Sequence, residues 1–182
     1  LHSRCVDYVK RQSDRAWSHI VHRLDRDTSG VMVFAKSRET KEILQTQFAQ
    51  REVRRMYHAL VEGRPEHSEG TDSSWLVEDK HLHVKRVKST FKGSKQSITH
   101  WRIEDQDEFV SLIEINIETG RRHQIRMAMQ FLGCPIVGDT IHGATTDPLS
   151  RICLHATSLG FTHPYTNDFV QYESNIPFAN RF

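Results

Sequence analysis

The sequence of 182 residues has few of the features that mark secreted, membrane-spanning or zinc-binding proteins. Its three cysteines, Cys5, Cys134 and Cys153, are scattered and form no CxxC pair. Such a set argues against a disulfide framework or a zinc knuckle and favours a reducing compartment. There is no run of about 18 apolar residues, and the first ten residues lack the apolar core of a signal peptide. We therefore expect a cytoplasmic protein.

The overall charge is also small, at a formal +2, and by itself says little about partners. Hydrophobic residues make up 37% and charged residues 26%, which is a globular balance, and the length suits one domain with a substantial core. The twelve histidines are spread along the chain. His81 and His83 would share one face of a strand, where a solvated face is a better explanation than a metal site.

Basic residues gather in one stretch, which has no acid after Asp79. They are Lys80, Lys85, Arg86, Lys88, Lys92 and Lys95. A local stripe of this kind can follow a phosphate backbone. An exposed hairpin with solubilising lysines explains the same charges equally well, so both interpretations stay open.

Apolar periodicity and turn residues predict more strands than helices. A partly helical start (1–20) precedes a short buried strand (31–35), and Ser37 is expected to cap a helix over 38–50. Further strands are expected at 56–62 and 110–118, two or three more within 75–103, and short ones near the end. A polar loop is expected at 65–74 and a helix at 122–132. This order predicts an α+β fold with a largely antiparallel or mixed sheet.

The most unusual segment is 22–30, HRLDRDTSG, just ahead of a buried apolar run. Loops at strand ends are where rigid scaffolds present reactive groups. Arg23 and Arg26 flank Asp25, and positive charge nearby favours the carboxylate form, which can act as nucleophile, base or metal ligand. The same residue types also build and brace ordinary turns, and on chemistry alone that explanation is the stronger one.

A second charged cluster lies at 118–126, ETGRRHQIR, where a strand gives way to a helix. Backbone N–H groups at a helix start and guanidinium groups suit a phosphate or a carboxylate. A charged, solvated helix face is the alternative, at similar weight.

Four segments together resemble the motifs of the RluA-type pseudouridine synthases. The first is 22–30, and the second is 54–61, RRMYHALV. The third is 119–126, TGRRHQIR, followed by GCPIVGD at 133–139, and the last is 152–156, ICLHA. They come in the family's order and spacing, and the resemblance runs from about residue 22 to residue 178.

The resemblance implies a pseudouridine synthase fold and an enzyme that isomerises uridine in RNA. The N-glycosidic bond breaks, the uracil turns, and C5 is joined to the ribose. By the same resemblance Asp25 is the nucleophile, attacking either the ribose or the base, and Arg126 pairs with it. Tyr57 stacks on the flipped uracil and is a candidate to take the C5 proton, while Leu154 walls the pocket. Simple core packing is the alternative for Tyr57 and Leu154.

The resemblance also implies how RNA is held. Moving the target base out of its stack costs a few kcal/mol, and Arg23 matches the residue that fills the vacated space. Residues that would contact the RNA are Arg121, Arg122, His123, Lys85, Arg86 and Lys88. No metal and no organic cofactor is implied, because the substrate is rearranged without redox chemistry or hydrolysis.

The sequence departs from the family pattern in places that spare Asp25 and Tyr57. Ala128 stands where the family often has His, and His142 follows the Gly-Asp pair where Tyr is usual. We expect residues 1–182 to form a single catalytic domain without the family's first strand, which contains Lys-Pro, and without an S4 domain. We expect it to work as a monomer on ribosomal or transfer RNA.

Two other functions are compatible with parts of the pattern. One is a catalytically idle RNA-binding module on the same fold, although such a module would have no reason to keep Asp25, Tyr57 and Arg126 together. The other is a hydrolase that uses Asp25 and Asp27, two carboxylates only two positions apart in a turn.

Overall fold

The computed structural model describes residues 1–178, and its centre is an eight-stranded sheet. The strands follow the order β10-β9-β4-β8-β7-β5-β6, with β2 beside β9, while β1 and β3 form a separate pair. Neighbours in that order are antiparallel and β2 runs parallel to β9, so the sheet is mixed. This confirms the α+β prediction. The strands are β1 (His19–Ile20), β2 (Ser29–Gly30), β3 (Phe34–Ala35), β4 (Arg54–Glu62), β5 (Glu69–Glu78), β6 (Val84–Val87), β7 (Lys95–Gln106), β8 (Val110–Ile117), β9 (Leu154–Thr162) and β10 (Phe169–Glu173).

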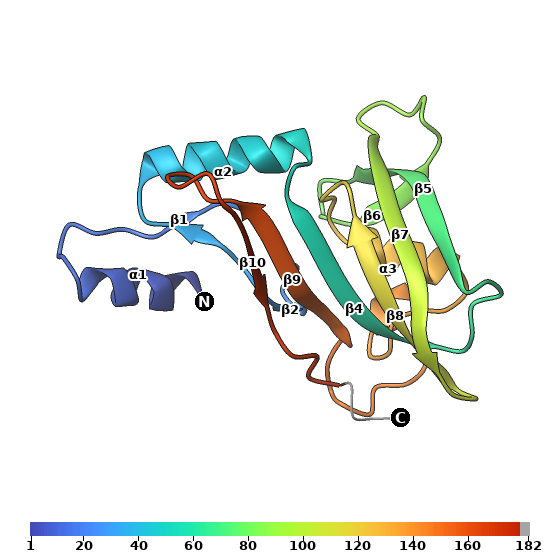
Figure 1. The fold of residues 1–182 in the computed structure, drawn as a ribbon. Coiled ribbons are helices and arrows are strands. Elements are labelled where there is room, and N and C mark those ends of the chain that lie inside the picture. The colour runs from blue at the N-terminus through green and yellow to red at the C-terminus, as the bar shows by residue number, and fades with distance from the viewer. Residues whose placement is uncertain (179–182) are drawn as a thin grey trace.

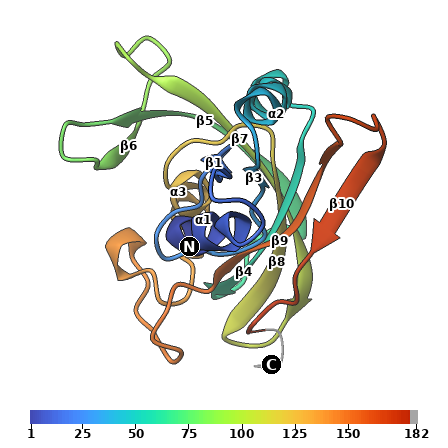
Figure 2. The ribbon, with the colours of Figure 1, turned by 90° about the vertical axis from the view of Figure 1, so that its left-hand side faces the viewer.

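Helices accompany the sheet without covering all of it. They are α1 (His2–Lys10), α2 (Arg38–Gln50), α3 (Gln124–Phe131) and the short 3-10 helix η1 (Thr140–His142). Figure 2 shows α1 and α3 on the same side of β4, β8 and β9, with β10 at the far edge. None of the helices in residues 1–178 is long and apolar enough to cross a membrane.

Helix α2 forms as its sequence predicts. The side chain of Ser37 accepts a hydrogen bond from the backbone N–H of Thr40 at 3.1 Å, which satisfies a free donor of the first turn. Leu44 is buried on the inner face, and the helix ends where Arg51 adopts a left-handed conformation.

Helix α3 is shorter than the sequence predicted. It begins at Gln124 rather than at residue 122, because His123 has a φ of 52° and cannot continue a right-handed helix backwards. Ile125 and Met129 are buried on one face, as expected, and pack into the main core. The two preceding arginines therefore lie in a loop, where their side chains are free to face a cavity.

Strand β4 lies in the middle of the sheet, between β9 and β8 (Figure 1). It pairs with β8 on one side and β9 on the other, and residues from Tyr57 to Val61 are all buried. Ile113 and Ile115 of β8 are fully buried beside it. From Tyr57 to Val61 both faces of the predicted strand at 56–62 are therefore buried.

Three local predictions were wrong. The expected loop at 65–74 is already strand from Glu69, where small polar residues of β5 pair with β7. The expected buried strand at 31–35 is strand only over Phe34–Ala35. The N–H of Val31 donates to the carbonyl of Ala156 and so ends the short β2–β9 pairing, and the N–H of Val33 donates to the ring of His22 instead of a backbone carbonyl. His81 and His83 lie in the exposed turn between β5 and β6, not on a strand.

Candidate active site

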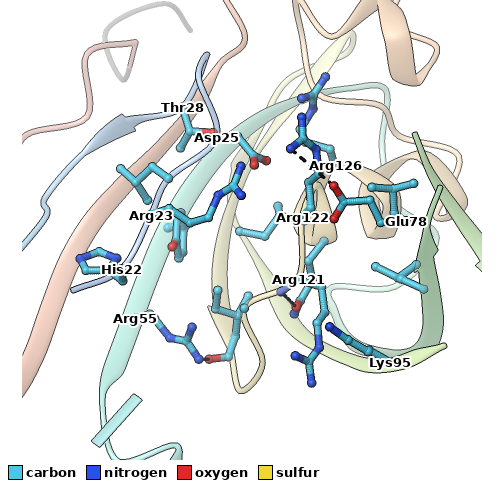
Figure 3. A pocket seen from close by; sticks show the side chains of 18 of the residues that line it. His22, Arg23, Asp25, Thr28, Arg55, Glu78, Lys95, Arg121, Arg122 and Arg126 are labelled. Carbon is cyan, nitrogen blue, oxygen red and sulfur yellow. Dashed lines mark hydrogen bonds and ion pairs between the residues drawn. The ribbon is translucent and has the colours of Figure 1, made fainter. Parts of the chain in front are cut away.

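A cavity of about 590 Å³ opens beside β4 and gathers most of the residues singled out in the sequence. The loop before β2, strand β4, the β5–β6 hairpin and the loop before α3 all contribute to its wall. In Figure 3, Arg23 and Asp25 lie on one side and Arg121, Arg122 and Arg126 on the other. Tyr57 and Leu154 also line it. Segments about a hundred residues apart in the sequence thus meet at one site.

The Asp25 side chain is half-buried in a tightly anchored loop. The backbone N–H of Thr28 donates to the carbonyl of Asp25 at 3.0 Å, which closes a turn. Gly30 follows with a φ of 121°, and a Cβ there would lie 2.2 Å from the carbonyl oxygen of Ala156. Only glycine fits such a close approach, so this Gly fixes the loop against β9.

Asp27 does not reach the same cavity. It lines a separate hollow of about 490 Å³ and forms an exposed ion pair with Arg26 at 3.5 Å. Asp25 and Asp27 therefore do not form the pair of carboxylates that a hydrolase would need.

The prediction that Arg126 pairs with Asp25 is wrong. Arg126 instead grips Asp139 through two hydrogen bonds, Nε to Oδ2 at 2.7 Å and Nη2 to Oδ1 at 2.6 Å. Both side chains are almost completely buried, at 3% and 0% exposure. A bidentate pair of this kind gives Arg126 a fixed place in the wall, and Asp139 balances its charge.

Tyr57 and Leu154 form the apolar floor of the cavity. They come from the paired strands β4 and β9 and belong to the main core. The pKa of the Tyr57 hydroxyl is raised to about 12, mainly by burial and also by the charge of Asp25, with Arg55 acting in the opposite direction. The Tyr57 hydroxyl therefore stays protonated at neutral pH.

Arg121 and Arg122 face the cavity from the loop before α3. Nε of Arg121 donates to the carbonyl of Gln96 at 2.9 Å. Glu78, at the end of β5, lies beside Arg122, with its Oε1 3.7 Å from Nη1 of Arg122 (Figure 3). Glu78 and Asp25 are the two acids among the described residues that line this cavity, against several arginines and Lys95.

His123 lies beside the cavity and is not one of the residues that line it. Its Nδ1 is 3.1 Å from Nε2 of His142, and the two rings meet edge to face. Burial and the nearby Arg126 lower the pKa of His123, while Asp25 acts in the opposite direction. His123, which was predicted to contact RNA, is thus held by the imidazole of His142. His142 stands where Tyr is usual in the family.

The basic stripe divides into two kinds of residue. Lys85 and Lys88 are exposed, but Arg86 pairs with Asp72 at 2.7 Å and its guanidinium lies 3.6 Å from the ring centre of Phe131. These contacts tie the β5–β6 hairpin to α3. Arg86 therefore has a structural role in the free protein that charge counting did not reveal.

The comparisons with known proteins agree with this geometry. The family model for RNA pseudouridylate synthase matches residues 2–131. The chain belongs to this family. As the sequence predicted, it is of the RluA type.

Individual relatives of this pseudouridylate synthase chain are similar over most of its length. It is 36% identical over 172 residues to the uncharacterized RNA pseudouridine synthase YjbO of Bacillus subtilis, covering 94% of this chain and 60% of that protein. It is 36% identical to the ribosomal large subunit pseudouridine synthase D of Nitrosomonas europaea, covering 87% of this chain and 48% of that protein. The chain thus spans roughly half to three fifths of the length of these curated relatives.

Solved structures show the same fold. Human RNA Pseudouridylate Synthase Domain Containing 1 superimposes with a TM-score of 0.75 at 27% identity, over 88% of this chain and 70% of that one. Human RNA Pseudouridylate Synthase Domain Containing 4 gives 0.74 at 23% identity, over 88% and 72%. Both support the pseudouridine synthase fold expected from the motifs.

Reasoning from the sequence missed four residues of this cavity. Arg55 donates to the carbonyls of Ile117 and Glu118 and so holds the loop before α3. Buried Gln124 bonds to Thr119, Arg121 N–H, Ile98 and Thr99, which fixes the same loop from within. Glu78 and His22 also line the cavity. Arg55, Gln124 and His22 lie inside the quoted motifs, whereas nothing in the sequence marked Glu78.

Proposed function

We propose that this chain converts specific uridines of structured RNA to pseudouridine, with Asp25 as the nucleophile. The observation that carries the proposal is the meeting of Asp25, Tyr57, Leu154 and Arg126 around one cavity with an arginine-rich wall. Family membership supports the reaction class, and the geometry supports the residues.

The reaction needs a base that has left its stack, because Asp25 lies inside a cavity and not on a flat surface. A cavity of about 590 Å³ is within the range that accepts small ligands, and its wall offers both an apolar floor and polar groups. Asp25 attacks the ribose or the base, the N-glycosidic bond breaks, and the uracil turns within the cavity. C5 then joins the ribose C1′ and the bond to Asp25 breaks, which returns the free carboxylate. The C5 proton is lost, and N1 gains a proton. The atoms balance without a cofactor.

Tyr57 serves first as a platform for the uracil, with Leu154 beside it. Its hydroxyl, with a pKa of about 12, is a poor base by itself at neutral pH. For the Tyr57 oxygen to receive the C5 proton, a neighbouring group must take the Tyr57 proton, and Asp25 is the carboxylate whose charge acts on this hydroxyl.

Asp139 holds Arg126 in place, and Arg126 contributes a polar group to the wall opposite the Asp25 loop (Figure 3). The exposed arginines Arg23 and Arg121, with Arg122 and Lys95, suit the phosphates of the RNA strand. Arg23 comes from the same loop as Asp25, where it can occupy the space that the flipped base leaves. His123, Lys85 and Lys88 extend the proposed contact surface.

The RNA substrate is proposed at the level of class. One relative is named for the large ribosomal subunit, which makes ribosomal RNA one candidate, and transfer RNA is the other. We propose a monomer that acts in the cytoplasm.

Mapping of pseudouridine across all cellular RNA tests this function. Cells that lack the gene should lose pseudouridine at one or a few uridines, and a plasmid copy of the gene should restore it. An identical map in both strains, with no conversion of any of those RNAs by the purified chain, would contradict the proposal and favour the idle RNA-binding module.

A further inference from the structure

The loop that carries Asp25 is closed at its base by a histidine. β1 and β3 pair through His19 with Ala35 and Ile20 with Phe34, so the chain between them forms one long loop. Directly beyond this ladder, the backbone N–H of Val33 donates to Nε2 of His22 at 3.1 Å. The His22 side chain thus replaces the next backbone bond of the ladder.

This bond requires an unprotonated Nε2 on His22, because a backbone N–H can only donate. The ring stacks on Phe48 with centres 4.7 Å apart, so it is held between the loop and α2. Burial and the charge of Arg55 on β4 together lower the pKa of His22 to about 4, with a hydrogen bond to the backbone of Arg23 acting in the opposite direction. The neutral ring that the geometry needs is therefore the favoured form at neutral pH.

A second histidine holds the other side of the loop. Nδ1 of His155 lies 2.7 Å from the hydroxyl of Ser29 in β2. Nη2 of Arg151 lies 2.6 Å from the same hydroxyl, and Nε2 of His155 lies 3.1 Å from the hydroxyl of Ser174. His155 is buried, so this chain of contacts is shielded from water at its centre.

One arrangement of this chain gives every side-chain donor an acceptor. Arg151 can only donate, so the Ser29 oxygen accepts from it, and the Ser29 O–H has Nδ1 of His155 within reach as its acceptor. In this arrangement Nδ1 carries no proton, and the N–H at Nε2 donates to Ser174. A proton on Nδ1 would leave the Ser29 hydroxyl hydrogen without its acceptor. Burial lowers the pKa of His155, and the positive charges of Arg151 and of His58 on β4 act in the same direction.

We propose that His22 and His155 are positioning residues for Asp25, each acting as a neutral acceptor that anchors one side of its loop. The inference rests on the proposed function, since it assigns these two rings to the placement of the proposed nucleophile. Neither ring needs to touch the uridine for this role. The groups that face them are Arg55 and Arg23 for His22, and Arg151, His58, Ser29 and Ser174 for His155.

Two matched pairs of variants test the proposal. His22→Gln keeps an acceptor near the place of Nε2, and His155→Asn keeps one near the place of Nδ1, whereas His22→Leu and His155→Leu remove it. Conversion of a C5-tritiated RNA substrate is followed by tritium release. We expect the Leu variants to lose about tenfold to a hundredfold in kcat, with KM for RNA nearly unchanged, since a small displacement of a reacting group has effects of this size. The Gln and Asn variants should recover most of the loss.

A spectroscopic measurement keeps the proposal testable if a Leu variant fails to fold. Two-bond ¹H–¹⁵N correlation spectra of the native chain at neutral pH should show an unprotonated Nε2 on His22 and an unprotonated Nδ1 on His155. A proton on either nitrogen would overturn the assignment for that ring. Folded Leu variants with the kcat of the native chain, or acceptor variants as slow as the Leu variants, would overturn the positioning role.

These outcomes are distinct from failure of the proposed function. If the native chain converts uridine and the Leu variants match it, only the positioning role is lost. If the native chain converts no RNA at all, the proposed function fails, and the ring spectra still test the two anchors.

Discussion

At the scale of single residues, two arginines of the cavity differ in how closely an acidic side chain balances their charge. Arg126 is satisfied by Asp139 in a buried pair, so it contributes shape and polarity rather than a free charge. Arg122 faces Glu78 at 3.7 Å, beyond hydrogen-bonding distance and partly exposed to solvent. The buried pair of Arg126 with Asp139 is strong, whereas Arg122 can leave Glu78 and bind an RNA phosphate instead.

We predict that Glu78→Gln strengthens RNA binding by about twofold to fivefold, the size expected for one exposed ion pair. The carboxylate competes with RNA phosphate for Arg122, and the amide does not. Fluorescence anisotropy with a labelled RNA measures the change. Glu69→Gln is the matched control, because it removes the same charge at the exposed start of β5.

Arg122→Gln provides the second control for this prediction. In that background Glu78→Gln should bring almost no gain, since the group for which Glu78 competes is gone. An equal gain with and without Arg122, or an equal gain from Glu69→Gln, would mean that only the overall charge matters.

The roles of single residues could be predicted from the sequence only within the segments that resemble the family motifs. Asp25, Tyr57 and Leu154 were expected together and do line one cavity. The partner of Arg126 was mistaken, because a buried arginine bonds to the carboxylate that its surroundings bring closest, and the loop after Gly138 places Asp139 there. Glu78 could not be found, since its relevance depends on the β5–β6 hairpin reaching across to α3.

At the scale of elements, the hairpin of β5 and β6 is held by Arg86. Its guanidinium bonds to Asp72 within the hairpin and lies over the ring of Phe131 at the end of α3. The ion pair is partly shielded from water, at 29% and 13% side-chain exposure, whereas the Phe131 ring is exposed. The hairpin supplies Glu78, so this contact also sets one wall of the cavity.

We predict that Arg86→Ala lowers the free energy of unfolding by about 1 to 2 kcal/mol, through loss of the cation–π contact and the ion pair. Lys85→Ala, one position earlier and exposed, should change it by less than about 0.5 kcal/mol. Urea unfolding followed by fluorescence compares the two. Equal effects of both substitutions would show that Arg86 does not brace the hairpin.

Elements were predictable where the local signals agreed. The cap at Ser37 and the helical spacing of Leu44 and Phe48 defined α2 at both ends. The start of β5 was missed because its residues are small and polar, and pairing with β7 decides their conformation. The strand expected at 31–35 is shorter than its apolar residues suggest. Val31 and Val33 pack in the second core cluster, but the Val33 N–H bonds to the ring of His22 rather than to a neighbouring strand.

At the scale of the whole molecule, one central strand explains why distant motifs converge. β4 carries Tyr57 and Arg55, pairs with β9 beside the Asp25 loop, and pairs with β8, which leads into the loop before α3. The family and the fold class followed from the order of the motifs, and both are confirmed. The sheet order and the cavity required the structure, because pairing between strands far apart in sequence leaves no local pattern.

The proposed role of Asp25 as the nucleophile of an RNA isomerase is tested by the variant Asp25→Asn. Tritium release from C5-labelled uridine in an RNA substrate is compared with the native chain and with Asp27→Asn, a carboxylate outside the cavity. We expect Asp25→Asn to abolish tritium release while largely keeping RNA binding. Asp27→Asn should still release tritium. Release by Asp25→Asn at a rate close to that of the native chain would contradict the proposed role.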